Sequence, residues 1–295
     1  NPHAAMEPAM SDYTPHFYRS ACDRLKLFAR DYGGDGPPLL LMHGLTRNSA
    51  DFEPLAGHLA GRYRLIVPDQ RGRGLSHYDP DPANYRPDIY ARDMFALLDN
   101  LGIQRATLIG TSMGGLMAMI MAAVAPERVS AIVLNDIGPE IDAEGLARIG
   151  GYVGGIEAFA GWQEAAARCE AVNRDAFPDF TTPDWDAFAR RTCRVIEDGT
   201  VTFAYDPAIA KGFETEGGVA PPDLWPLWQA LGDKPVLVIR GALSDLLSTD
   251  TVTRMAQLHS GPLAHVDIPR RGHAPLLDEP EAVAAITAFL AEHAS

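Results

Sequence analysis

A serine flanked by glycines is the feature of this sequence that most directly suggests chemistry. Gly110-Thr111-Ser112-Met113-Gly114 matches the pattern G-x-S-x-G. It lies between an apolar run with a strand pattern, at 106–109, and a long uncharged helical run, at 115–125. A nucleophile elbow has this strand–turn–helix context, and its glycines permit the sharp turn that lifts the serine clear of the sheet. We therefore predict that Ser112 is a nucleophile. The alternative is a serine that only caps the following helix.

A serine nucleophile needs a base and an acid from elsewhere in the chain. An imidazole takes the hydroxyl proton, and a carboxylate orients that imidazole and stabilises its charged form. His273 lies in the loop 271–275 before the last predicted helix and is the predicted base. Asp245 lies just past the C-terminal end of the buried strand predicted at 236–241 and is the predicted acid.

The same chemistry needs two N–H donors for the oxyanion that forms on the attacked carbonyl. The backbone N–H of Met113, directly after the serine, is one predicted donor. The second is expected in the loop after an earlier strand, and His43-Gly44-Leu45 follows the strand predicted at 39–42. We predict that the second donor is the N–H of Leu45.

Taken together, these motifs resemble the α/β-hydrolase superfamily, and they follow the family order from about Tyr18 to the C-terminus. The elbow with its second glycine, and the short loops, are most similar to esterases and enol-lactonases with a helical cap. In some members the acid follows the sixth strand, so the resemblance makes Asp136 the second candidate. The pieces that carry the resemblance are His43-Gly44, the segment 69–76, the elbow at Ser112, Asp245 and His273. We interpret His43 as structural, and Asp69 and Arg71 as paired with each other or capping nearby backbone.

Strand and helix patterns alternate along most of the chain, which predicts an α/β fold with a mostly parallel, doubly wound sheet. The rhythm stops between 138 and about 222, where helical patterns occur without a convincing strand. The resemblance implies the α/β-hydrolase fold with a helical cap inserted between strands 6 and 7. We therefore predict a core at 13–138 and 223–295, a cap (lid) at 139–222, and a loose N-terminal tail at 1–12. The predicted strands are 16–20, 25–30, 39–42, 63–68, 106–110, 130–135, 235–241 and 264–268, and the predicted helices outside the cap are 52–60, 89–101, 115–125, 224–231, 252–258 and 279–294.

Composition restricts the remaining possibilities. The chain has 295 residues, of which 25 are Lys or Arg and 39 are Asp or Glu, giving a net charge of −14. This charge disfavours polyanions such as nucleic acid as partners. The three cysteines, Cys22, Cys169 and Cys193, do not form a disulfide framework. We expect neither a cofactor nor a metal, since no dinucleotide, P-loop or metal-ligand motif is complete. No signal-peptide or membrane pattern stands out, so we expect a cytoplasmic protein, and its oligomeric state stays open.

The sequence thus predicts a serine hydrolase that cleaves an ester or lactone of a small, largely apolar molecule. Arg47, Trp162 and Trp185 are candidate substrate-binding residues, the tryptophans as part of an aromatic pocket roof. Three alternatives stay open, one of which is an acyltransferase that passes the acyl group to an alcohol in place of water. A carbon–carbon bond hydrolase of ring-cleavage diketones would use the same triad, with Arg47 or Arg190 binding the substrate carboxylate. A ligand sensor would keep the fold and the triad but signal through cap movement with little turnover.

Overall fold

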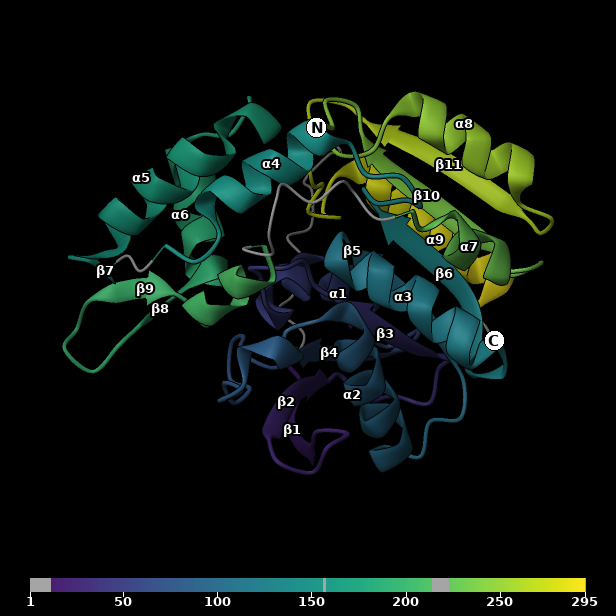
Figure 1. Cartoon of the computed structure of the whole chain (residues 1–295), viewed down its shortest axis with the longest axis horizontal. Coiled ribbons are helices and arrows are strands. Elements are labelled where there is room, and N and C mark those ends of the chain that lie inside the picture. Colours follow the sequence, from purple (N-terminus) through teal and green to yellow (C-terminus); the bar gives the residue numbers. More distant parts are fainter. Residues whose placement is uncertain (1–11, 156–157, 214–222, 295) are drawn as a thin grey trace, which may run out of the picture.

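An eight-stranded sheet forms the centre of the molecule (Figure 1), in a computed structural model that describes residues 12–155, 158–213 and 223–294. Its strand order is β1-β2-β4-β3-β5-β6-β10-β11. β2 pairs antiparallel with β1 and with β4, and all other neighbours are parallel. The strands are β1 Thr14–Arg19, β2 Lys26–Asp31, β3 Pro38–Met42, β4 Arg64–Asp69, β5 Ala106–Thr111, β6 Val129–Asn135, β10 Val236–Gly241 and β11 Leu263–Ile268.

Helices cover both faces of this sheet. Strand β3 shows why: Leu39 and Leu41 enter the hydrophobic core on one face, and Leu40 and Met42 enter the core on the other. Side chains of a strand alternate between faces, so a strand covered on both sides is apolar throughout. On one face lie α1 Glu53–Leu59 and α9 Pro280–His293, and on the other α2 Pro87–Asn100, α3 Met113–Val124, α7 Trp225–Ala230 and α8 Thr249–Leu258. The 3₁₀ turns are η1 Ser49–Phe52, η2 Pro82–Asn84, η3 Pro126–Arg128, η4 Arg174–Ala176 and η5 Pro207–Phe213.

The predicted fold class, a mostly parallel α/β sheet wound on both faces, is confirmed. The segment between β6 and β10 also carries helices, as expected, and we call its described residues, 139–155 and 158–213, the cap. It differs from the expectation in one respect, because it also contains a small sheet of order β7-β9-β8. Strands of two or three residues are too short to show an alternating pattern in the sequence. The cap elements are α4 Ala143–Tyr152, β7 Ala158–Phe159, α5 Trp162–Asn173, α6 Thr182–Thr192, β8 Cys193–Val195 and β9 Val201–Phe203.

The cap is attached to the loops of the core by backbone and side-chain contacts. The Gly272 N–H donates to the Ala176 carbonyl at 2.8 Å, and the Gly74 N–H donates to the Ala204 carbonyl at 2.8 Å. Arg271 Nη1 donates to Asp179 Oδ1 at 2.6 Å. In Figure 1 the cap helices and the small sheet lie beside one end of the main sheet. The loops that carry the candidate site residues therefore lie between the core and the cap.

Candidate active site

Ser112 stands at a strained turn between β5 and α3. Its φ is 51° and its ψ is −112°, in the positive-φ region that residues with a side chain rarely adopt. Its N–H donates to the Asn135 carbonyl at 2.9 Å, and its carbonyl accepts from the Gly115 N–H at 2.8 Å. These bonds hold the turn at both ends. The Ser112 side chain makes no helix-capping hydrogen bond, so the capping alternative does not describe this residue.

The two glycines of the pattern are required by close backbone contacts. A Cβ on Gly110 would lie 2.3 Å from the carbonyl carbon of Gly114. A Cβ on Gly114 would lie 2.0 Å from the carbonyl oxygen of Met42, at the end of β3. Any larger residue would push helix α3 away from the sheet. The steric reason expected for the G-x-S-x-G pattern therefore holds in the structure.

His273 joins Ser112 to a carboxylate through both of its ring nitrogens. Ser112 Oγ and His273 Nε2 are 2.9 Å apart, and His273 Nδ1 is 2.7 Å from Asp136 Oδ2. The Asp136 side chain is fully buried, and the His273 side chain is 8% exposed. With the proton on Nδ1 directed at the carboxylate, Nε2 is left to accept the serine proton. The structure thus brings Ser112 and His273 together as the sequence predicts.

The carboxylate on His273 belongs to Asp136, the second candidate, and the prediction of Asp245 is wrong. Asp136 follows β6 with a positive φ of 55°. Its Oδ1 accepts from the Gly241 N–H at 2.7 Å, and its Oδ2 accepts from Ser244 Oγ at 2.6 Å. These donors come from the end of β10 and the loop after it. The loop that was expected to supply the acid therefore holds a carboxylate that follows the neighbouring strand.

Asp245 instead forms an ion pair with the cap. Its carboxylate accepts from Arg148 Nε at 2.5 Å and from Arg148 Nη2 at 3.0 Å, and Arg148 lies on α4. Burial tends to raise the pKa of Asp245, but the hydrogen bond and positive charge of Arg148 outweigh it, so the pKa is lower than usual. The Asp245 side chain is 28% exposed. This half-buried pair connects the cap to the core and leaves the imidazole to Asp136.

The loop after β3 is organised by His43. Its Nδ1 is 2.7 Å from the Gly44 carbonyl oxygen, and its Nε2 accepts from the Gln70 N–H at 3.0 Å. Burial lowers the pKa of His43 to about 4, because a charged imidazole would lose its hydration. A neutral His43 therefore fixes the loop that presents Leu45, in agreement with its structural interpretation. Arg73 Nε also holds this loop, donating to the Leu45 carbonyl at 2.8 Å.

Asp69 and Arg71 take structural positions, but they do not pair with each other. Asp69 accepts from the Ser49 N–H at 2.7 Å and from the Leu75 N–H at 2.8 Å, so its backbone-capping role is as expected. Arg71 instead bonds to two other carboxylates, Asp79 at 2.7 Å and Asp93 at 2.8 Å. Arg71, Asp79 and Asp93 form a cluster, and each of their side chains is at most 1% exposed. The cluster anchors the loop after β4 beside the site.

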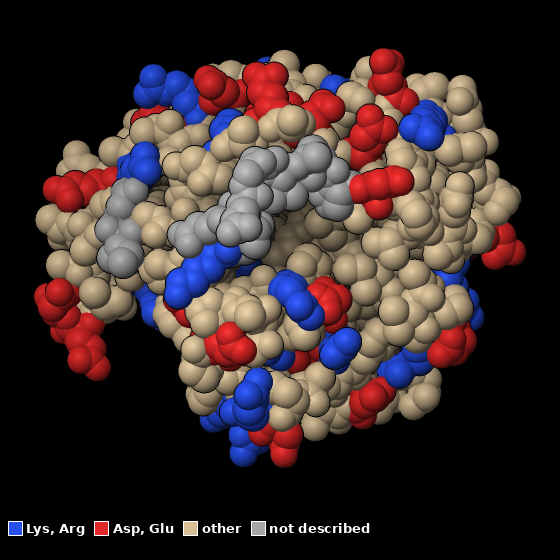
Figure 2. All heavy atoms as spheres, in the orientation of Figure 1, with Lys and Arg blue, Asp and Glu red and all other residues tan. Residues whose placement is uncertain are grey.

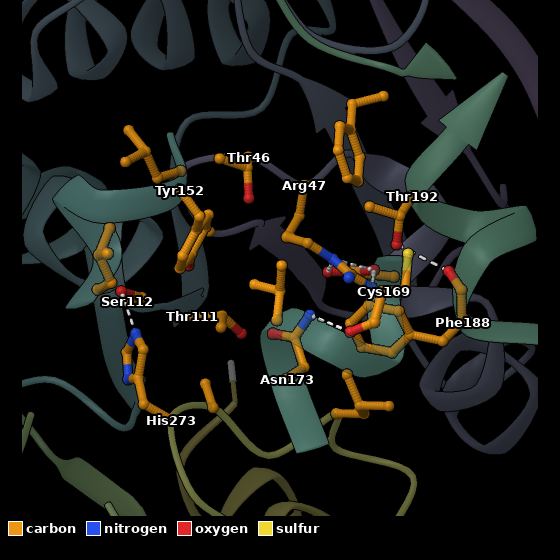
Figure 3. Close-up of a pocket in the computed structure, with 18 of the residues that line it drawn as sticks. Thr46, Arg47, Thr111, Ser112, Tyr152, Cys169, Asn173, Phe188, Thr192 and His273 are labelled. Atoms are coloured by element: carbon orange, nitrogen blue, oxygen red, sulfur yellow. Dashed lines mark hydrogen bonds and ion pairs between the residues drawn. The ribbon is translucent and has the colours of Figure 1, made fainter. Parts of the chain in front are cut away.

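A cavity opens beside Ser112 and His273, and we call it the polar cavity because Thr46, Arg47 and Asn173 line it, although most of its lining is apolar. Figure 3 shows Thr46, Arg47 and Asn173 across the space from these two residues. Its volume is about 100 Å³. It is lined by Gly44, Leu45, Thr46, Arg47, Asp51, Phe52, Thr111, Ser112, Ile149, Tyr152, Arg168, Cys169, Val172, Asn173, Phe177, Phe188, Thr192, Phe203, Tyr205, His273, Ala274, Pro275 and Leu276.

Of the three candidate substrate-binding residues, only Arg47 lines this cavity. Its Nε donates to Asp51 Oδ2 at 2.8 Å, and its guanidinium lies 4.0 Å from the ring centre of Phe188. Trp185 is 3% exposed and packs against Phe177 and Phe188 in the cap core. Trp162 is covered by Arg190, at 4.8 Å. The two tryptophans are therefore not at the pocket, and smaller aromatic residues, Phe177, Phe188, Phe203 and Tyr205, line it instead.

A second cavity, which we call the apolar cavity, reaches Ser112 from another direction. Its volume is about 200 Å³. Its lining contains the backbone-donor candidates Leu45 and Met113 but not His273. The sequence analysis did not separate this cavity from the first, because its walls come from six distant segments of the chain. It is lined by Leu45, Tyr85, Pro87, Tyr90, Ser112, Met113, Leu116, Ile137, Ile141, Leu146, Ile149, Ile209 and Leu246.

Among the described residues, the cysteines, the potential metal ligands and the apolar helices give no further candidate for the site. None of the three cysteines forms a disulfide; Cys22 is exposed, and the cap residues Cys169 and Cys193 are buried. Among the described residues, no group of three or more His, Cys, Asp or Glu side chains could hold a metal ion. In the same part of the chain, no helix has the length and apolar character needed to cross a membrane. Acidic and basic side chains are interspersed on the face shown in Figure 2, without a continuous basic patch.

Comparison with known proteins agrees with this architecture. The family model described as alpha/beta hydrolase fold matches residues 37–280. The chain is 33% identical over 268 residues to the 3-hydroxybutyrate-oligomer hydrolase of Cupriavidus necator, covering 88% of this chain and 90% of that relative. It is 32% identical over 256 residues to the 2-(acetamidomethylene)succinate hydrolase of Mesorhizobium japonicum, covering 86% and 88%. A crystal structure of an alpha/beta hydrolase from Novosphingobium aromaticivorans superimposes with a TM-score of 0.89 at 45% identity, covering 96% and 99%. The chain belongs to the α/β-hydrolase family.

Proposed function

We propose that this protein is a serine hydrolase that cleaves a carboxylic ester or lactone of a small molecule through an acyl-enzyme on Ser112. The observation that carries the proposal is the continuous hydrogen-bonded chain from Ser112 through His273 to the buried Asp136. Its distances are those over which protons move between a nucleophile and its base. The fully buried carboxylate is held by two further donors, so it is preorganised to stabilise an imidazolium.

In the first half-reaction Ser112 Oγ attacks the carbonyl carbon of the substrate while its proton passes to His273 Nε2. The carbonyl electron pair moves onto the oxygen, and we assign the backbone N–H groups of Leu45 and Met113 as its donors. When the C=O bond re-forms, the bond to the leaving alcohol oxygen breaks, and that oxygen takes the proton from Nε2. The acyl group is then esterified to Ser112.

In the second half-reaction water takes the place of the alcohol. His273 Nε2 removes a proton from the water as its oxygen attacks the acyl carbon, and the same proton returns to Ser112 Oγ when the acyl bond breaks. The products are a carboxylic acid and an alcohol, or one hydroxy acid from a lactone. The positive φ of Ser112 supports this scheme, because strain of this kind is retained where a fold positions a reacting group.

The cap, predicted over 139–222, has the role of a lid in this proposal. Tyr152, Cys169 and Phe188 come from its described part and line the polar cavity. The names of two relatives also support hydrolysis of small substrates derived from carboxylic acids. One name specifies oligomers of 3-hydroxybutyrate and the other 2-(acetamidomethylene)succinate. The carbon–carbon hydrolase alternative is less well supported, because Arg47 is already paired with Asp51 and Arg190 with Asp186.

A serine-directed fluorophosphonate probe tests the proposal. We expect one label per chain, located on the Ser112 peptide by mass mapping, and none on a Ser112→Ala variant. With p-nitrophenyl esters, Ser112→Ala and His273→Ala should each lose turnover on the order of a millionfold, as in a serine protease with this triad. Near-wild-type rates in either variant contradict the proposal. A single turnover without recycling, accompanied by ligand-dependent cap protection, would favour the sensor alternative.

A further inference from the structure

Two cavities meet at Ser112, both mainly apolar, and the polar cavity carries more polar groups than the apolar one. Both are lined by Leu45, Ser112 and Ile149, so a substrate bound to the serine has access to each. His273 lines only the polar cavity, and Met113 lines only the apolar one. An ester has two portions, an acyl chain and an alcohol, that extend in different directions from the attacked carbon. The structure therefore offers a separate compartment for each portion.

The position of His273 decides which portion enters which cavity. The leaving alcohol oxygen must receive its proton from His273 Nε2, so this oxygen has to lie on the imidazole side of Ser112. We infer that the polar cavity holds the alcohol portion of the substrate and the apolar cavity holds the acyl chain. This inference rests on the proposed serine hydrolase function, and it assigns a substrate class: esters of an apolar acyl chain with a polar alcohol.

The lining of the apolar cavity fits an acyl chain without polar groups. Its two phenol groups already have partners, because the Tyr85 hydroxyl donates to Asp206 Oδ2 at 2.6 Å and the Tyr90 hydroxyl accepts from Arg73 Nη1 at 2.8 Å. The rest of the lining is aliphatic side chains and the Ser112 hydroxyl. Its volume of about 200 Å³ exceeds that of an apolar cavity of about 150 Å³ that binds benzene in another protein. An acyl chain of about six carbons is therefore the expected occupant.

The polar cavity fits an alcohol that carries hydrogen-bonding groups. Thr46 and Asn173 lie across the space from Ser112 and His273 (Figure 3). Arg47 also lines it, but the carboxylate of Asp51 balances its charge. Asn173 Nδ2 already donates to the Cys169 carbonyl at 2.9 Å, so the Thr46 hydroxyl is the group that a hydroxyl or carbonyl on the alcohol portion can bond, and an alkyl alcohol would not make this bond. Specificity of this kind depends on a polar group that only the correct substrate satisfies.

Two substrate series separate the cavities. The acyl series consists of p-nitrophenyl esters from acetate to octanoate, and the alcohol pair consists of propyl acetate and the nearly isosteric 2-hydroxyethyl acetate. In the wild-type protein we expect the highest kcat/KM near hexanoate, and a higher kcat/KM for 2-hydroxyethyl acetate than for propyl acetate.

Leu146→Trp fills the apolar cavity from α4, and Leu146→Ala enlarges it. We expect Leu146→Trp to lower the kcat/KM ratio of hexanoate to acetate at least tenfold, and Leu146→Ala to move the optimum to longer chains, with the alcohol preference unchanged within twofold. Ala147→Ser, at the exposed next position of the same helix, is the matched control and should change neither series. Thr46→Val should reduce the preference for 2-hydroxyethyl acetate several-fold and leave the acyl optimum in place.

Three results would overturn the inference. If the Leu146 variants change the alcohol preference and not the acyl profile, the two portions are assigned to the wrong cavities. If the variants turn over esters with neither series altered, the apolar cavity does not hold the substrate. If the wild-type protein neither takes the fluorophosphonate label nor turns over any ester, the proposed function fails, and the inference fails with it. Labelling of Ser112 in each variant shows that the variant is folded.

Discussion

Replacing Asp136 by Asn is the sharpest test of which carboxylate serves the imidazole. The change removes the charge of a fully buried side chain and offers an amide where His273 Nδ1–H now meets a carboxylate oxygen at 2.7 Å. The imidazole then favours the tautomer with its proton on Nε2, which cannot accept the serine proton. In a serine protease the same substitution at the triad acid lowers kcat about 10⁴-fold without disturbing the geometry. We expect a loss of kcat of similar size for Asp136→Asn, with a small change in KM.

Asp245→Asn is the matched control, since it makes the same substitution on a carboxylate of the adjacent loop. The Arg148 and Asp245 side chains are 31% and 28% exposed. Solvent screening limits such a pair to less than about 1 kcal/mol, so kcat should stay within about threefold of the wild type. The assay is steady-state hydrolysis of a p-nitrophenyl ester, together with urea unfolding to confirm that both variants are folded. A loss of a thousandfold or more for Asp245→Asn, with Asp136→Asn nearly fully active, would refute the reasoning.

Three further predictions concern the residues that hold the site in place. Because the folded-state pKa of His43 is lowered from 6.5 to about 4, the unfolded chain binds the extra proton first, so stability is full above pH 6.5 and falls as the pH drops toward 4. At about 1.4 kcal/mol per pKa unit, the free energy of unfolding should be about 2 kcal/mol smaller at pH 5 than at pH 7. In urea titrations, the His43→Gln variant should lack this pH-dependent part of the free energy of unfolding. Equal pH dependence in the variant and the wild type would contradict the prediction. Gly114→Ala should lower the free energy of unfolding by about 1 to 3 kcal/mol, because its Cβ would overlap the Met42 carbonyl. Gly151→Ala, in α4 with nothing within 4 Å, should raise it by about 0.5 to 1 kcal/mol, and denaturant midpoints that move in the same direction for both would exclude this explanation. Arg71→Leu leaves the buried carboxylates of Asp79 and Asp93 without their cation, so we expect a loss of about 3 to 5 kcal/mol. The exposed control Arg190→Leu should cost less than about 1 kcal/mol, and calorimetric or urea data that show equal losses would argue against a buried cluster.

The features that the sequence determined by itself are local ones. The elbow is five consecutive residues in a strand–turn–helix context, so its pattern could be recognised without knowledge of the rest of the fold, although the contact that requires Gly114 comes from Met42 on β3. The buried strands were equally clear, because each is covered on both faces and reads as a continuous apolar run. His273 could be found for a related reason, since it stands in a short loop between a strand pattern and the last helix.

Tertiary structure alone decided which carboxylate contacts His273. β6 and β10 are parallel neighbours, so the residues after both strands arrive at the same edge of the sheet. The sequence analysis favoured Asp245 and kept Asp136 as the second candidate, because spacing along the chain does not show which of the two reaches His273. The choice depends on the positive φ of Asp136, on its bonds to Gly241 and Ser244, and on Arg148, which draws Asp245 toward the cap.

The cap also shows what the sequence alone does not determine. Its aromatic residues were recognisable in the sequence, but which of them face the cavity depends on how α5 and α6 pack together, and this placed Trp185 in the cap core and Phe188 at the pocket. The helical and strand periodicities of the sequence indicate which residues are buried, but they do not indicate which residues those pack against. A hydrogen bond between residues 137 positions apart, as between Asp136 and His273, leaves no periodic signal in the chain, because it depends on where the whole sheet brings the two loops.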